Sequence, residues 1–326
     1  MNRSSAARTA CVAGLAMWTV WAAGVSAQSY PGKPVRIVVG YAPGGGTDIT
    51  SRIVAQKLAD LLGQSVLVEN RTGAAATIAA ERVATSAPDG YTLLMMAAAD
   101  SAQPALRKLN YDLQRDLAPI TRVVRGPAFV LVVHPALPAK NALGLAQLAK
   151  SKPGQVSFAS SGVGSQAHLA GALLGFMMKV ELGHVPFKLI SDATVSVVNG
   201  DILMGFPSVP AALPLLGNGK LRAVAVTSVR RVGVLAAVPT LDESGLKGYD
   251  REGWYGLLAP GKLPAAIVGQ LNTAVGKVLD SPETQRAFEK QGLESAHTTP
   301  ADFAALIRTE VTQSAQLIKL AGVKPE

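Results

Sequence analysis

A glycine-rich segment between a predicted strand and a predicted helix is the first place where this chain could bind a ligand. The segment 41–48 contains Gly44, Gly45 and Gly46 in succession, and glycines let another group approach the backbone closely. The first backbone N–H groups of a helix lack intrahelical acceptors, and the helix dipole adds partial positive charge there. The segment therefore predicts an anion site formed by backbone atoms.

The same segment has nearly the spacing of a nucleotide-binding P-loop, but it lacks the lysine of that motif. Gly40 is followed, after four residues, by Gly45, and the next residues are Gly46 and Thr47. In a P-loop a lysine in the position of Gly46 reaches the β- and γ-phosphates. Its absence argues against a nucleoside triphosphate. A tight strand-to-helix turn that binds nothing is the structural alternative.

A second segment in the middle of the chain repeats this arrangement. A strand predicted from Gln155 runs into a Ser/Gly-rich turn, and a helix follows that is expected to direct Leu169 and Phe176 inward. The turn also fits the dinucleotide fingerprint G-x-G-x-x-A, although that motif normally belongs to the first βαβ unit of a domain. Its serines could instead serve only as turn and cap residues. Two helix starts suited to an anion, one in each half of the chain, are the main observation.

Asp48 and His168 are the titratable side chains of these two segments. A carboxylate that faced a bound anion would repel it, so Asp48 is expected to cap backbone N–H groups or to pair with Arg52. Alternatively, it meets an amine or hydroxyl of the ligand. His168 is expected to line or pack the site rather than act as a base, since no G-x-S-x-G elbow or triad context is present. The remaining histidines are isolated in the sequence and predict no metal site: His134, His184 and His297.

The predicted elements alternate between strands and helices, which indicates parallel, doubly wound sheets. A long apolar segment, 120–135, is expected to leave one domain and enter another with a break at residues 126–127, and 251–260 is expected to return. Residues 100–111 are expected to form a polar loop at the carboxyl end of a strand, where open α/β sheets bind ligands. The other expected strands cover 35–39, 65–70, 91–97, 155–160, 184–187, 202–206 and 221–227; the expected helices cover 47–62, 78–85, 143–150, 166–178, 265–279, 281–291 and 300–320, the last capped by Thr299.

The N-terminus has the pattern of a secretory signal peptide. Arg3 and Arg8 precede an apolar run that ends in the small residues Val25 and Ala27, so cleavage is expected after residue 27. Removal of this segment would also remove Cys11, the single cysteine. No later segment has the roughly 20 consecutive apolar residues that a membrane span needs.

The charge of the chain is basic but dispersed. The formal net charge is +9, and only 5% of the residues are aromatic. The basic residues stand singly or in pairs, which argues against a nucleic-acid surface. A mildly basic exported protein is better suited to attract small acids over long range.

Several segments together resemble the Bug proteins, the solute receptors of tripartite tricarboxylate transporters. They are "YPGKPVRIVVGYAPGGGTDITSRIVAQKLADLLGQSVLVENRTGA", "APDGYTLL", "FASSGVGSQAHLAGALL", "HVPFK", "GKLRAVAVTS" and "WYGLLAP". The resemblance runs from about Tyr30 to the end of the chain. It implies a type II periplasmic binding protein of the Venus flytrap kind, in which two α/β lobes, joined by two crossover strands, close on a small carboxylate.

The resemblance also implies a domain organisation and a binding site. Residues 28–125 and 253–326 would form lobe 1, and residues 126–252 would form lobe 2. The implied ligand contacts are Tyr41, Ala42, Gly44, Gly45, Gly46, Thr47, Asp48, Ser160, Ser161, Gly162, Gly164, Ser165, His168 and Lys188. Where this chain departs from the usual pattern of the family, the residues are expected to lie on the specificity side of the cleft: Asp100, Ser101, Phe206 and Pro207.

The function that the resemblance implies is transport rather than catalysis. The protein would be a monomeric periplasmic receptor without cofactor or metal, which delivers its ligand to inner-membrane transporter subunits. Two alternatives stay open: a receptor that feeds a sensor kinase, and an exported α/β enzyme that uses the same cleft.

Overall fold

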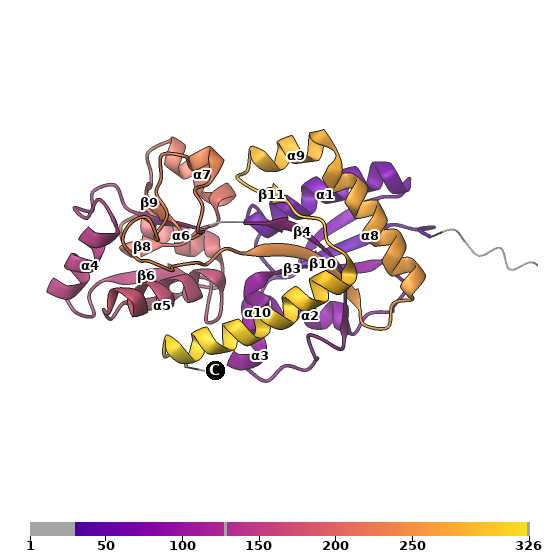
Figure 1. Ribbon diagram of the computed structural model, residues 1–326, viewed down its shortest axis with the longest axis horizontal. Coiled ribbons are helices and arrows are strands. Elements are labelled where there is room, and N and C mark those ends of the chain that lie inside the picture. Colours follow the sequence, from indigo (N-terminus) through magenta and orange to yellow (C-terminus); the bar gives the residue numbers. More distant parts are fainter. Residues whose placement is uncertain (1–29, 127–128, 325–326) are drawn as a thin grey trace, which may run out of the picture. The chain divides into compact units, whose positions relative to one another are not determined.

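The computed structural model describes residues 30–126 and 129–324 (Figure 1). The predicted signal peptide, 1–27, lies outside the described residues. All the helices and strands belong to one compact unit that begins at Pro31. Within the two described ranges, every helix is too short or too polar to cross a bilayer.

The first sheet has six strands in the order β11-β4-β10-β3-β1-β2. Its central strands are runs of β-branched and apolar residues buried on both faces, as the sequence predicts. β1 pairs in parallel with β2 and β3, whereas β10 runs antiparallel to β3 and β4, so this sheet is mixed rather than purely parallel. The strand bounds are β1 Val35–Val39, β2 Val66–Asn70, β3 Thr92–Ala97, β4 Leu117–Arg125, β10 Trp254–Pro260 and β11 Glu294–Ser295.

Helices cover both faces of the first sheet. α2 and α10 share one apolar core with the strands, and α1 and α8 pack together on the other side (Figure 1). Thr299 caps α10 by accepting a hydrogen bond from the Asp302 amide at 3.1 Å, as predicted. The helix bounds are α1 Gly46–Leu62, η1 Ala74–Ala76, α2 Thr77–Ala84, η2 Ala98–Ala102, α3 Gln103–Leu106, α8 Ala265–Asp280, α9 Pro282–Glu289 and α10 Pro300–Leu320.

The second sheet has five strands in the order β7-β6-β8-β5-β9. One of its cores includes residues of α4 and α5, and the other includes residues of α6 and α7, so this sheet is also covered on both faces. β6 is parallel to β7 and β8, whereas β5 is antiparallel to β8 and β9. The bounds are β5 Val130–Val133, α4 Ala142–Ser151, β6 Ser157–Ser160, α5 Gln166–Met178, β7 Gly183–Pro186, α6 Ile190–Val198, β8 Met204–Gly205, α7 Val209–Gly217, β9 Arg222–Val226 and η3 Gly233–Leu235.

The chain passes between the two sheets twice. β4 ends at Arg125 in the first sheet and β5 begins at Val130 in the second, so the predicted break in this apolar segment is a crossing. After β9 the chain returns to the first sheet as β10. The residue limits predicted for the two lobes stay a prediction.

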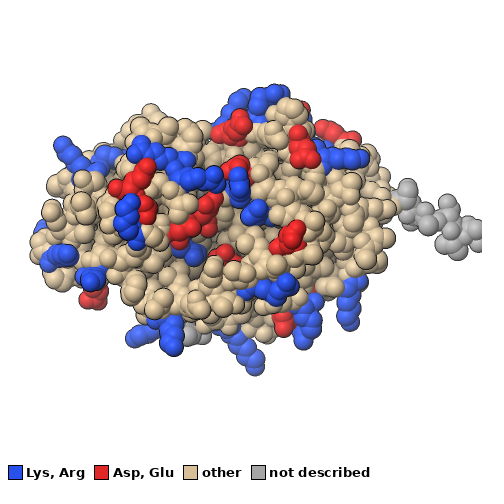
Figure 2. Space-filling view, viewed as in Figure 1, with Lys and Arg blue, Asp and Glu red and all other residues tan. Residues whose placement is uncertain are grey.

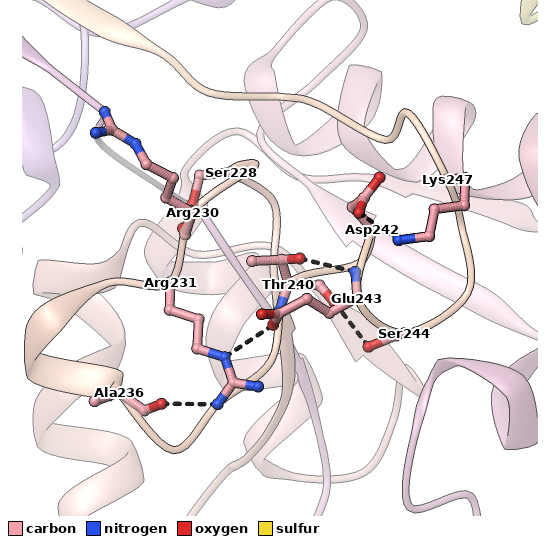
Figure 3. Close-up of polar contacts among 9 residues, drawn as sticks. All are labelled: Ser228, Arg230, Arg231, Ala236, Thr240, Asp242, Glu243, Ser244 and Lys247. Atoms are coloured by element: carbon pink, nitrogen blue, oxygen red, sulfur yellow. Dashed lines mark hydrogen bonds and ion pairs between the residues drawn. The ribbon is translucent and has the colours of Figure 1, made fainter.

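A network of polar contacts holds the segment between β9 and β10 (Figure 3). Arg231 Nε donates to Glu243 Oε2 at 2.8 Å, and the same oxygen accepts the Thr240 amide at 2.9 Å. Arg230 extends away from this cluster and lies 4.0 Å from Glu294 of the first sheet. The returning segment is therefore fixed within the second lobe and also linked to the first.

Two expectations about local structure are wrong. Residues 100–111 are not a simple loop, because they contain the end of η2 and the short helix α3, whose first turn includes Pro104. Phe176 is not directed inward but is 50% exposed. α5 instead packs through small residues, since a Cβ on Gly171 would lie 2.3 Å from the Phe158 ring.

Candidate ligand-binding site

The starts of α1 and α5 line the same small cavity. This inner cavity has a volume of about 40 Å³. From the α1 side it is lined by Gly45, Gly46 and Thr47, and from the α5 side by Ser161, Gln166 and Ala167. The structure thus brings together the two helix starts that the sequence singled out. The other lining residues come from five further places in the chain: Tyr41, Ala97, Phe129, Ile190, Ser208 and Tyr255.

A larger outer cavity of about 570 Å³ shares Tyr41, Ser161 and Ile190 with the inner one. The predicted contacts Ala42, Gly162 and Lys188 line it. The remaining lining residues are Gly40, residues 72–76, Arg107, Val163, Phe187, Leu189 and Asp192.

One wall of the outer cavity has an uncommon backbone conformation. Ala74, Ala75 and Ala76 have φ values of 45°, 50° and 72°, a left-handed region that costs about 1–2 kcal/mol for each residue other than glycine. Gly40 makes room for this segment, because a Cβ there would lie 2.3 Å from the Ala76 Cβ. The surrounding structure therefore holds this wall in place.

The start of α1 has no side-chain cap. Gly45 is the N-cap residue, and its extended backbone accepts the Ile49 amide at 2.9 Å. The Gly46 amide donates to the Ser208 hydroxyl at 3.2 Å, a contact between the first and second lobes. A Cβ on Gly46 would lie 2.6 Å from the Tyr255 hydroxyl. Glycine at this position thus keeps the inner cavity open.

Asp48 has the structural role that the sequence predicts. Its Oδ2 accepts from the Gly44 amide at 3.0 Å and from Arg52 Nε at 2.9 Å, and its Oδ1 accepts from Asn70 at 2.9 Å. Burial opposes ionisation, but the hydrogen bonds from Arg52, Gly44 and Asn70 lower the pKa of Asp48 below its ordinary value. Its carboxylate therefore orders the loop before α1 through three protein donors. A direct contact of Asp48 with a ligand stays a prediction.

The start of α5 is partly capped by its own residues. The Ser165 hydroxyl accepts the His168 amide at 3.3 Å, and His168 Nδ1 accepts the Gly164 amide at 3.0 Å. Gly164 has a φ of 78°, and a Cβ there would lie 2.3 Å from Leu106. These contacts fix the turn and leave Gln166 and Ala167 at the inner cavity.

His184 is not isolated, contrary to the sequence-based expectation. Its ring stacks on His168 with a centroid separation of 3.9 Å, and its Nε2 lies 2.6 Å from the Ser160 hydroxyl. Burial lowers the pKa of His168 to about 3 and that of His184 to about 4, so both rings are neutral near pH 7. The sequence gave no sign of this pair, because a strand pairing brings the two rings together.

The histidine pair does not form a catalytic or metal centre of a familiar kind. Ser160 is fully buried, and in the described ranges no carboxylate is hydrogen-bonded to His184. In the same ranges, no group of three or more His, Cys, Asp or Glu side chains is arranged to hold a metal.

The residues predicted for the specificity side lie behind the cavity walls. Asp100 accepts the Tyr41 hydroxyl at 2.5 Å and the Ala97 amide at 2.9 Å, and Ser101 is buried beside it. Phe206 is fully buried and packs edge-on against Phe158 in the core of the second sheet. None of the four predicted residues lines the inner or outer cavity. Their effect on ligand choice stays a prediction and would be indirect.

Of the predicted contacts, Gly44, Asp48, Ser160, Gly164, Ser165 and His168 also lie outside the lining of both cavities. They support the two turns that present the lining residues. Sequence reasoning missed Ser208 and Tyr255, although each follows a residue or motif that it had noted, Pro207 and "WYGLLAP". Their approach to the α1 start depends on the crossing between sheets, which leaves no local pattern.

Comparison with known proteins gives the family. Residues 50–323 match the family model described as "Tripartite tricarboxylate transporter family receptor". The chain is 34% identical over 306 residues to Protein BugT of Bordetella pertussis, which covers 93% of this chain and 94% of that protein.

Solved structures agree with this match. Rpa4515 of R. palustris, solved with adipate, superposes with a TM-score of 0.87 at 31% identity and covers 91% of this chain and 100% of its own. The periplasmic binding protein BugD gives a TM-score of 0.86 at 33% identity, with the same coverage of 91% and 100%. MatC of Rhodopseudomonas palustris with bound malate gives 0.83 at 31% identity, covering 89% of this chain and 100% of its own. With two lobes, two crossings and two helix starts at one cavity, this chain belongs to the receptor family of the tripartite tricarboxylate transporters.

Proposed function

We propose that this protein is a periplasmic receptor that captures a small carboxylate between its two lobes and delivers it to an inner-membrane tripartite tricarboxylate transporter. The observation that carries the proposal is that the starts of α1 and α5 line one cavity. In a helix, the amides of the first turn lack intrahelical acceptors. At α1 these include Thr47, and at α5 Gln166 and Ala167, so backbone donors from both lobes can surround one carboxylate.

The second end of the ligand would lie in the outer cavity. That cavity is the larger of the two, and Lys188 provides a cation in its lining. Two related receptors of the family were solved with adipate and with malate, which are dicarboxylates. We therefore propose that the ligand has two acidic ends, one at the helix starts and one toward Lys188.

Binding would close the two lobes. A ligand that contacts both helix starts binds the closed arrangement better than an open one, which shifts the population toward closure. At 100 times the dissociation constant, such a ligand stabilises the folded protein by about 2.7 kcal/mol.

A direct test uses the exported protein, purified without refolding. N-terminal sequencing is expected to start at Gln28, and native mass spectrometry should show any ligand retained from the cell. Adipate and malate are then titrated by calorimetry, with small-angle scattering to follow closure. We expect binding with a decrease in the radius of gyration. A rise in melting temperature without this decrease would instead place the ligand on one lobe only.

The non-enzymatic assignment is tested by turnover. The bound acid, incubated with the purified protein and recovered after denaturation, should be chemically unchanged. Consumption of the acid would favour the exported-enzyme alternative. The sensor alternative is addressed by deletion of the transporter membrane subunits, since uptake of the acid by cells that contain the receptor should then stop.

A further inference from the structure

Asp100 and Tyr41 form a hydrogen-bonded pair at the wall of the ligand cavities. Tyr41 lines both cavities, and its hydroxyl donates to Asp100 Oδ1 at 2.5 Å. Ala97, which lines the inner cavity, donates its amide to Asp100 Oδ2 at 2.9 Å. The Asp100 side chain is nearly completely buried. Its carboxyl group is therefore separated from the cavities by these wall residues.

No cation balances this carboxyl group. In the described ranges Asp100 forms no ion pair with a lysine or arginine, and the phenolic groups that face it are those of Tyr41, Tyr111 and Tyr255. Helices α5, α10 and α3 also pack against η2. Their titratable groups act elsewhere: His168 on α5 accepts the Gly164 amide, Glu310 on α10 interacts with Arg251 and Trp254, and Arg107 after α3 donates to the Val163 carbonyl.

A bound carboxylate and an ionised Asp100 would place two negative charges on opposite sides of Tyr41. Little water separates them there, so their repulsion is strong. We infer that ligand capture is proton-linked at Asp100: the anion binds with Asp100 protonated, and Tyr41 then turns its hydroxyl hydrogen toward the ligand. This inference rests on the proposed function and adds a residue pair that selects the conditions of binding.

The proton exchange conserves every hydrogen bond of the pair. While Asp100 is ionised, the Tyr41 O–H donates to it. Once Asp100 is protonated, its own O–H donates to the Tyr41 oxygen, which frees the tyrosine hydrogen, and Ala97 still donates to the other carboxyl oxygen. Burial raises the pKa of Asp100 to about 7 against the effect of the hydrogen bonds from Tyr41 and Ala97, so this exchange occurs in the physiological range.

Calorimetric titration with adipate and with malate between pH 6.5 and 8.5 tests the inference, because carboxylic acids of ordinary pKa are ionised throughout this range. For the wild type we expect the dissociation constant to increase above pH 7, approaching tenfold per pH unit. Titrations in two buffers of different ionisation enthalpy should show uptake of up to one proton.

Two variants and two controls identify the group. D100N places an amide that donates to Tyr41, as protonated Asp100 would, so we expect wild-type low-pH affinity with no pH dependence. Y41F removes the donor, and we expect a severalfold loss of affinity at pH 6.5. D60N, which removes an exposed carboxylate of α1, and Y249F, which removes a buried hydroxyl of the second lobe, should retain the wild-type pH dependence.

The outcomes separate this inference from the proposed function. If the acids bind without proton uptake, or if D100N retains the wild-type pH dependence, the inference is overturned and the receptor assignment stands. If no carboxylate binds at any pH, both are overturned. Carboxyl-carbon NMR of the ligand-free protein adds a test without ligand, in which Asp100 titration near pH 4 would also overturn the inference.

Discussion

The two helix starts at the inner cavity are built differently. α1 begins at Gly45 without a side-chain cap, and its Gly46 amide donates to Ser208 of the other lobe. α5 begins at Ser165, whose hydroxyl accepts the His168 amide within the same turn. The first start thus depends on groups from outside its own turn, whereas the second is largely complete in itself. This difference suggests that α1 contributes most to anion binding and α5 provides a rigid surface for closure.

The largest expected effect comes from a glycine of the α5 turn. Gly164→Val should lower stability by about 4 kcal/mol, since valine meets both a left-handed backbone and a close contact with Leu106. For a protein of this size the melting temperature should fall by about 8–16 °C. Differential scanning calorimetry measures this. A stable variant that only lost ligand affinity would show that the α5 turn acts as an anion site like that of α1.

The corresponding change at α1 should affect binding more than folding. Gly46→Val extends into the inner cavity toward the Tyr255 hydroxyl. We expect at least a hundredfold weaker binding of adipate or malate by calorimetry, about 2.7 kcal/mol. Gly269→Val is the matched control, because a Cβ there meets nothing within 4 Å. Equal affinities of the two variants would remove α1 from the site.

Titration should also distinguish the two turns. In the window from about pH 4 to 7 the folded protein retains a proton on Asp100, behind the first turn, that the unfolded chain has lost. Its contribution to stability therefore decreases as pH rises, by about 1.4 kcal/mol per unit. His168, in the second turn, has a pKa lowered to about 3, so its contribution decreases as pH falls below 6.5.

Urea denaturation at several pH values separates these opposing slopes. The free energy of unfolding of D100N, minus that of the wild type, should increase from pH 5 to 7 and then level off. For His168→Asn the corresponding difference should increase as pH falls below 6.5. Parallel curves for all three proteins would mean that neither group titrates as its burial implies.

A smaller effect is expected from the cap of α5. Ser165→Ala removes the acceptor of the His168 amide and should reduce stability by about 1 kcal/mol, or roughly 2–4 °C in melting temperature. Ligand affinity should change less than twofold, because Ser165 does not line either cavity. A loss of affinity larger than the loss of stability would contradict this division of roles.

The smallest effect is expected at the contact between the lobes. Ser208→Ala removes the acceptor of the Gly46 amide, a neutral hydrogen bond of about 0.5–1 kcal/mol. Scattering of the ligand-free protein should then show a more open average, with unchanged melting temperature. Ser191→Ala, an exposed serine of α6, is the control. An unchanged radius of gyration would show that Ser208 does not hold the lobes together.

The sequence predicts much of this fold because its strongest signals are local. The buried strand Val35–Val39, the glycine turn after it and the cap at Thr299 each depend on neighbouring residues, and the structure agrees at all three. The positions of Ser208 and Tyr255 at the α1 start depend on the crossings, and the His168–His184 stack depends on a strand pairing. No periodicity or spacing reports such contacts.

The place of β10 has a consequence for the order in which the chain folds. β10 lies between β3 and β4, yet it follows the whole of the second sheet in the sequence. A growing or translocating chain can complete β5 to β9 from contiguous segments, while the first sheet stays divided until Trp254–Pro260 is available. Pairings between distant segments form slowly. The lobe that begins the chain is therefore the last to be completed, and a chain cut before Trp254 would retain only the second sheet intact.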